Sequence, residues 1–93
     1  MVKGISPKHF FTYGETALNV YHANKGQGIP SHSHEYSHAT VCMAGSCKLT
    51  QDNKSVVVDK NSIPVNLLAG KLHEIEALEN GTVFVNVFAQ GKY

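Results

Sequence analysis

The sequence predicts an all-β protein, either a sandwich or a small barrel. Short runs of strand-forming residues alternate with turn signals, and no segment shows a sustained helical period with caps. Many short strands separated by frequent turns are typical of these two architectures. The turn signals are clusters of Asn, Asp, Lys and Gly at residues 24–28, 52–54, 59–61 and 79–81.

We expect strands where apolar and β-branched residues gather between these turns. The run 17–23 (ALNVYHA) alternates, with Leu18, Val20 and His22 on one face. Asn80-Gly81 stands between two such runs and is a strong hairpin signal. The remaining expected strands cover residues 39–44, 55–58, 72–77 and 82–89.

Length and composition predict one small domain, residues 1–93. Eight Lys, no Arg and a net charge of +1 disfavour nucleic-acid binding, which needs clustered basic residues. Apolar runs are too short to span a bilayer, and the first residues lack the apolar core of a signal peptide. We therefore expect a cytoplasmic protein without a membrane or nucleic-acid partner.

The run 39–44 also predicts a partner. If His38 points inward, Thr40 and Cys42 do too, which leaves Ala39, Val41 and Met43 as an outward apolar row. Such a row needs a cover, supplied by another layer of the chain or by a second subunit. For so short a chain we expect a homodimer.

Histidines carry the main functional signal. His32, His34 and His38 fall within seven residues, and His73 follows downstream. Residues i and i+2 of a strand share a face, so His32 and His34 would present two imidazoles side by side. Imidazole is the commonest protein ligand for divalent transition metals, and a metal site is the favoured interpretation. The alternatives are a solvated, His-rich turn and, for His73, a half-buried polar strand residue.

The spacing of this segment resembles the first motif of the cupins, G-x5-H-x-H-x3,4-E-x6-G. Gly26, His32, His34 and Gly45 match it, and His38 stands where most cupins carry Glu. We place this motif at residues 26–45. The second cupin motif, placed at 62–77, matches only at Gly70 and His73; Ser62, Leu68 and Ala77 replace its Gly, Pro and Asn.

The resemblance implies a small antiparallel β-barrel, or double-stranded β-helix of jelly-roll type, with a metal at its centre. It places the metal ligands at His32, His34, His38 and His73. The resemblance implies manganese, iron, nickel or copper, which small four-histidine cupins carry. All-imidazole sites suit Zn, Cu, Fe and Ni better than Mg or Ca, and the sequence leaves the choice among Fe, Mn, Ni, Cu and Zn open.

The residues near these histidines give weaker indications of function. Tyr36 shares the side of His34 and His38 on a regular strand, as a candidate catalytic residue or a packed aromatic. Glu35 would face away from the ligands. Cys42 and Cys47 flank the turn at 44–45, and if this turn is a two-residue hairpin they lie opposite each other. A disulfide between them is geometrically demanding, and two reduced core thiols are favoured.

Two functions stay open. The resemblance favours a metal-dependent oxygenase of dioxygenase type, and the missing Arg argues against acidic substrates held by a guanidinium. A small neutral or chelating molecule, such as a diketone, enol or catechol-like compound, fits better. The alternative is a non-catalytic module that binds a metal or small ligand as a sensor or accessory protein; a closed structural zinc site is a third candidate.

Overall fold

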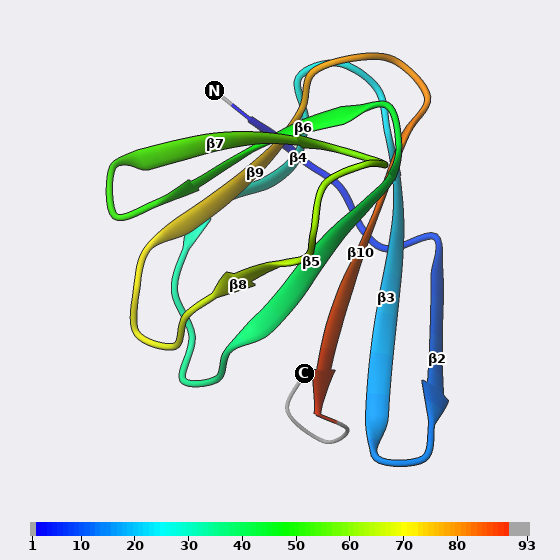
Figure 1. Ribbon diagram of the computed structural model, residues 1–93, viewed down its shortest axis with the longest axis vertical. Coiled ribbons are helices and arrows are strands. Elements are labelled where there is room, and N and C mark those ends of the chain that lie inside the picture. Colours follow the sequence, from blue (N-terminus) through cyan, green and yellow to red (C-terminus); the bar gives the residue numbers. More distant parts are fainter. Residues whose placement is uncertain (1, 90–93) are drawn as a thin grey trace.

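The computed structural model describes residues 2–89, which form ten strands and no helix (Figure 1). No part of that range could therefore cross a membrane as a helix. The strands are β1 (Lys3–Gly4), β2 (His9–Tyr13), β3 (Thr16–Ala23), β4 (Gln27–His32), β5 (His38–Ala44), β6 (Ser46–Gln51), β7 (Lys54–Asp59), β8 (Val65–Leu67), β9 (His73–Ala77) and β10 (Thr82–Ala89).

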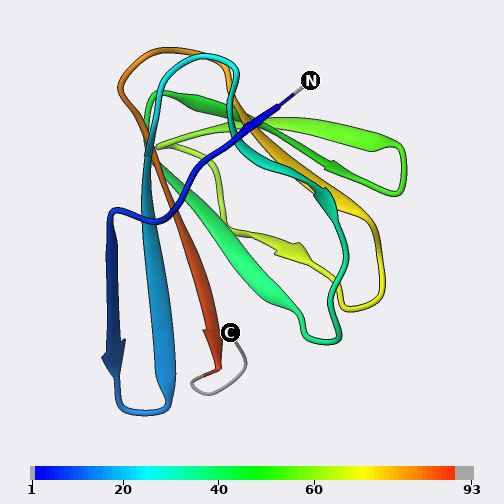
Figure 2. The same cartoon turned by 180° about the vertical axis from the view of Figure 1, so that it is seen from behind.

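The strands form two five-stranded sheets, in the orders β1-β4-β9-β6-β7 and β2-β3-β10-β5-β8. We call them the first and the second sheet. All pairs are antiparallel except β1 with β4. The chain passes repeatedly from one sheet to the other, and the views from front and back show the sheets stacked as two layers (Figure 2). This is a jelly-roll arrangement, and within residues 2–89 the sheets are not hydrogen-bonded into one closed barrel.

The all-β prediction is confirmed, and all five expected strands are present. Strands β1, β2, β4, β6 and β8 were not predicted from the sequence; β1 and β8 are very short, and β4 carries Gly and Pro. One detail was wrong: Cys42 and Cys47 do not face each other across a hairpin, because β5 and β6 belong to different sheets.

A glycine allows the sharp change of sheet between these strands. Gly45 has a φ of +71°, a backbone conformation that residues with a side chain rarely adopt. A Cβ there would also lie 2.9 Å from Cα of Thr82 at the start of β10. The last glycine of the cupin-like motif is thus required by backbone geometry.

The inner face of the second sheet carries its side chains in cross-strand rows. Phe84 lies opposite Tyr21 on β3 and Cys42 on β5, and together with Leu49, Ile75 and Cys47 these residues form the apolar core. The next row is polar. In it, Asn86 lies opposite Asn19 and Thr40, all at most 2 % exposed. The histidines lie beyond this polar row.

Candidate metal centre

The fold brings together histidines that are far apart in the sequence. His32 ends β4, His34 lies in the turn after it, and His73 begins β9, directly opposite His32 in the register of the first sheet. One ring nitrogen from each of the three lies within 4.8 Å of the other two. Two imidazole nitrogens on one ion are at most about 4.2 Å apart, so small side-chain movements would complete a three-histidine site.

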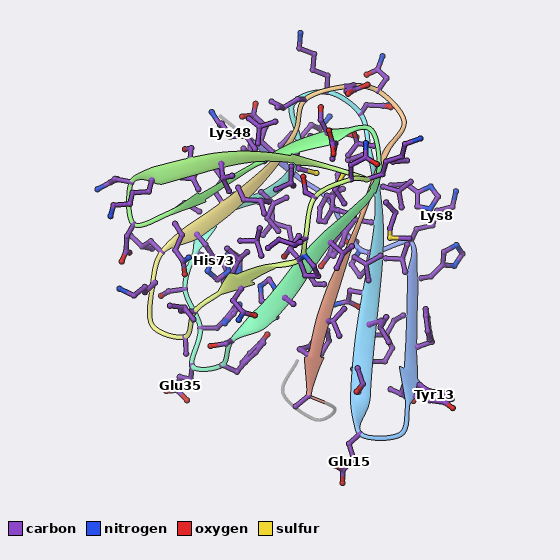
Figure 3. The ribbon with its side chains drawn as sticks, in the orientation of Figure 1. Lys8, Tyr13, Glu15, Glu35, Lys48 and His73 are labelled. Atoms are coloured by element: carbon purple, nitrogen blue, oxygen red, sulfur yellow. The ribbon has the colours of Figure 1, made fainter. Side chains whose placement is uncertain are left out.

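The fourth predicted ligand lies against this group from the other sheet. His38 begins β5, and its ring centre is 5.3 Å from those of His34 and His73. The His32 and His73 rings are closer, at 4.4 Å. His38 thus belongs to the ring cluster but not to the group of three converging nitrogens, and its role as a ligand stays a prediction. Figure 3 shows His73 within the molecule, between the two layers.

Backbone carbonyls orient the three converging rings in the same way. Nδ1 of His32 donates to the Pro30 carbonyl at 2.9 Å, Nδ1 of His34 to Tyr36 at 2.6 Å, and Nδ1 of His73 to Lys71 at 3.1 Å. A carbonyl oxygen only accepts, so the proton of each neutral ring is on Nδ1 and the lone pair is on Nε2. This is the arrangement that a metal-binding histidine needs.

Two of the freed nitrogens are buried without a partner. Nε2 of His34 and Nε2 of His73 are shielded from solvent and accept no hydrogen bond within the described part of the chain. A buried polar atom that makes no hydrogen bond costs free energy, roughly 1–3 kcal/mol. A cation that accepts both lone pairs would remove that cost.

Burial also keeps the deeper rings neutral. Burial, together with charge repulsion from nearby His73 and His34, lowers the pKa of His38 from 6.5 to about 4. Burial likewise lowers the pKa of His73 to about 4, with a contribution from His32. Neutral imidazole is the form that binds metal, so both rings can bind a cation at neutral pH without first losing a proton.

A hydrogen-bonded chain connects His38 to the polar row of the second sheet. The Thr40 hydroxyl donates to Oδ1 of Asn86 at 2.7 Å and lies 3.4 Å from Nδ1 of His38. Because its proton goes to Asn86, the hydroxyl offers His38 a lone pair. Nδ1 of His38 then donates, and its Nε2, like those of the other three rings, carries the lone pair.

The remaining predicted residues surround this cluster. Tyr36 stacks on His34 with ring centres 4.0 Å apart and also approaches Phe88. This packing supports the ring of His34, whereas the catalytic role predicted for Tyr36 stays a prediction. Glu35 is exposed and points away from the molecule (Figure 3), as the strand alternation predicts.

The other histidines and the cysteines take no part in the site. His9 and His22 are exposed, with ring centres 6.0 Å apart on the far side of the second sheet. Cys42 and Cys47 are free, buried thiols in the apolar core, and burial raises the pKa of Cys47 to about 12. The expected position of both thiols in the core is therefore confirmed.

Asn19 and Asn86 were missed by the sequence analysis. Their signal is visible in hindsight, because Asn86 interrupts the inward series of the run 82–89 between Phe84 and Phe88. A carboxamide at an inward position of an otherwise apolar strand is rarely buried without a reason. Its proximity to the histidines depends on how β5 and β10 pair, which the sequence alone does not give.

Comparison with known proteins supports the fold. No family model and no curated protein sequence matches the chain. Among solved structures, KdgF from Halomonas sp. superposes with a TM-score of 0.78 over 87 % of this chain and 74 % of that one, at 12 % identity. A cupin-2 domain protein from Shewanella frigidimarina gives a TM-score of 0.74 over 97 % of this chain and 85 % of that one, at 11 % identity.

A third structure is described as containing Mn(II) centres. Oxalate decarboxylase from Bacillus subtilis matches with a TM-score of 0.70 and 24 % identity, over 85 % of this chain and 22 % of that one. The fold of the chain is therefore that of the cupin superfamily, which confirms the resemblance of residues 26–45. Three of the histidines that carried this resemblance are positioned to bind a metal.

Proposed function

We propose that the chain is a metal-dependent cupin oxygenase that acts on a small neutral or chelating molecule. His32, His34 and His73 would hold a divalent transition metal, with His38 as fourth ligand from the opposite sheet. One observation carries the proposal: backbone carbonyls engage Nδ1 of all three rings and leave their Nε2 atoms free, and one ring nitrogen of each histidine lies within 4.8 Å of the other two.

The ligand atoms of the cluster limit which metals it would bind. The cluster consists of imidazoles without a carboxylate, since Glu35 points away. Imidazole suits Fe, Ni, Cu, Zn and, with less preference, Mn, whereas Mg and Ca prefer oxygen ligands. When bound, such a metal would act as a Lewis acid and, if redox-active, would allow reaction with O2.

The chain's own residues would position the ring ligands and limit access of water. The Tyr36 ring covers one face of His34, and the Thr40 hydroxyl and Asn86 hold His38. A cavity of about 210 Å³ between the sheets is lined by Leu67 and Gln51, the cross-strand neighbours of His38 and His73. It offers a mostly apolar space beside the site.

The experiment is O2 uptake by the Fe(II)-loaded protein in the presence of 2,4-pentanedione or catechol, followed with an oxygen electrode. We expect substrate-dependent uptake by the wild type and its loss in His34→Ala, with His9→Ala as a matched control that retains it. Uptake that persists in His34→Ala would assign the reaction to free iron and contradict the proposal.

The second candidate is a non-catalytic module that holds a metal or a small ligand. One observation favours it: the described cluster contains no carboxylate that could act as a general base. This function predicts ligand-dependent stabilisation of the metal-loaded protein without product, which thermal unfolding combined with product analysis would detect.

A further inference from the structure

Two buried carboxamides of the second sheet lack partners for their amide groups. Nδ2 of Asn19 and Nδ2 of Asn86 are shielded from solvent and donate no hydrogen bond within residues 2–89. The two residues are 2 % and 1 % exposed and lie directly opposite each other on β3 and β10. Leaving two buried donors unpaired costs stability, and such groups in a native interior call for an explanation.

Their position relates them to the metal centre. Asn86 accepts the Thr40 hydroxyl at 2.7 Å, and that hydroxyl lies 3.4 Å from Nδ1 of His38. The carboxamides thus form the row between the histidines and the apolar core. Val65, which lines the cavity of about 210 Å³, pairs with Thr40 across β5 and β8.

The hydrogen-bonding groups of this row indicate which class of ligand it would bind. Carboxamide N–H groups are neutral donors, so they would recognise an acceptor oxygen without requiring a full negative charge on it. A dication held only by neutral imidazoles keeps its whole charge and favours an anionic chelating ligand. An enolisable 1,3-dicarbonyl compound meets both conditions, since its enolate carries one charge shared by two oxygens.

We propose that Asn19 and Asn86 form a substrate subsite that donates hydrogen bonds to a carbonyl or enolate oxygen of a small dicarbonyl ligand. The proposal rests on the metal-binding function proposed above. It assigns specificity to the second sheet, whereas the three converging metal ligands come from the first sheet and the turn after β4.

The test is calorimetric titration of 2,4-pentanedione into Zn(II)-loaded protein, because zinc has no redox chemistry and binding is measured without turnover. Asn19→Leu removes the carboxamide and keeps a side chain that branches at Cγ. We expect it to weaken binding about tenfold, the effect of one hydrogen bond. Asn66→Leu, an exposed carboxamide on β8, is the matched control and should bind like the wild type.

Two further measurements, zinc content and urea unfolding, separate the possible outcomes. Zinc content measured before each titration tests the proposed function by itself; a wild type without zinc would refute both. With zinc bound, unchanged affinity in Asn19→Leu, or no binding by the wild type, would overturn the subsite alone. Urea unfolding of the metal-free protein should show Asn19→Leu at least as stable as the wild type; a clear loss would assign Asn19 a structural role.

An independent observation concerns the outer face of the second sheet. Since Asn19, Thr40 and Asn86 point inward, their strand neighbours point outward. Cross-strand pairing aligns these neighbours into two apolar rows. The first row is Phe11, Leu18, Val87 and Ala39, and the second is His9, Val20, Val85 and Val41.

This face lacks Lys, Asp and Glu. Among the outward positions of β2, β3, β10 and β5, the titratable side chains of the described strands are His9 and His22, and Phe11 and Met43 are 50 % and 56 % exposed. Four strands and about six residues span roughly 19 by 20 Å, or about 400 Å² in projection. A patch of about 400 Å² is comparable to the largest apolar patch of a typical monomer, which is often functional.

We infer that this face binds the same face of a second copy of the chain. A two-fold interface brings identical patches together, and a flat apolar patch without charge is complementary to itself. Its projected area is about half of the roughly 800 Å² per partner of a standard interface, so the surrounding residues of the sheet would complete the contact. A charged or nucleic-acid partner would find no counter-charge on it.

Light scattering after size exclusion tests the dimer. For a chain of 10.1 kDa we expect twice that mass, and the monomer mass for Val85→Lys and for Phe11→Glu, which is exposed enough to keep the fold. Thr50→Lys, on the outer face of the other sheet, is the matched control and should stay dimeric. A monomeric wild type, or a dimer that survives both substitutions, would overturn the inference.

Discussion

The two ends of the space between the sheets are formed by the same strands but differ in chemistry. At one end Tyr21 and Phe84 stack with ring centres 4.8 Å apart, and Leu49 and Ile75 close the core. At the other end His34, His73 and the carboxamide of Asn86 are buried with unpaired polar atoms. The apolar end stabilises the fold, which allows the polar end to keep groups that cost stability but bind a ligand.

The apolar end should show the largest effect of a single substitution. Phe84→Ala removes a fully buried ring at the centre of the core and should lower the free energy of unfolding by about 3–5 kcal/mol. Urea unfolding of the metal-free protein measures it. A loss below about 1 kcal/mol would show that this end does not carry the stability of the fold.

At the polar end, metal binding rather than the removal of a side chain should change the free energy of unfolding most. Zn(II) at one hundred times its dissociation constant should stabilise the wild type by about 2.7 kcal/mol, because only the folded chain brings the histidines together. His73→Phe should abolish this gain, since the phenyl ring fills the space without offering a nitrogen. Thermal unfolding with and without Zn(II) distinguishes the two proteins; equal gains would place the metal elsewhere.

The two ends should also differ in their response to pH. His38 and His73 have pKa values of about 4 in the folded protein and near 6.5 when unfolded, so between these values the unfolded chain binds more protons. The metal-free protein should therefore lose stability as pH falls from about 6.5 to 4, by roughly 1–2 kcal/mol per histidine. Urea unfolding across this range measures the slope, which should flatten in His38→Phe.

The smallest expected effect concerns Tyr36, which stacks on His34 without belonging to the core. Tyr36→Leu should lower the free energy of unfolding by about 1 kcal/mol, the contribution of an aromatic pair. Zinc affinity should fall only a fewfold, because the carbonyl that orients His34 belongs to the backbone and is retained. Competition with a chelator measures the affinity, and complete loss of zinc binding would make Tyr36 essential to the site.

The sequence predicted the fold class and the histidine cluster for different reasons. Alternation and turn signals are local, so the longer strands, such as residues 82–89, could be predicted directly. The alternation of His32 and His34 and the motif spacing likewise identified the cluster. His73 could be added only through the resemblance, because its position opposite His32 is a property of sheet pairing.

The features that could not be predicted from the sequence depend on contacts between strands that are far apart in the chain. The carboxamides of Asn19 and Asn86 are 67 residues apart and meet only because β3 and β10 pair in one register. The Nδ1 contacts of the histidines depend on backbone carbonyls whose direction no residue pattern encodes. The positions of Cys42 and Cys47 were mistaken for the same reason, since a tight turn predicts a hairpin and not a change of sheet.

Elemental analysis of the purified, untagged protein tests the central claim most directly. We predict close to one transition-metal ion per chain in the wild type and in His9→Ala, and loss of that metal in His34→Ala, with all three proteins folded by circular dichroism. A wild type that contains no metal and takes none up when Fe, Mn, Ni, Cu or Zn is supplied would contradict the account. The histidine cluster would then be a metal-free pocket.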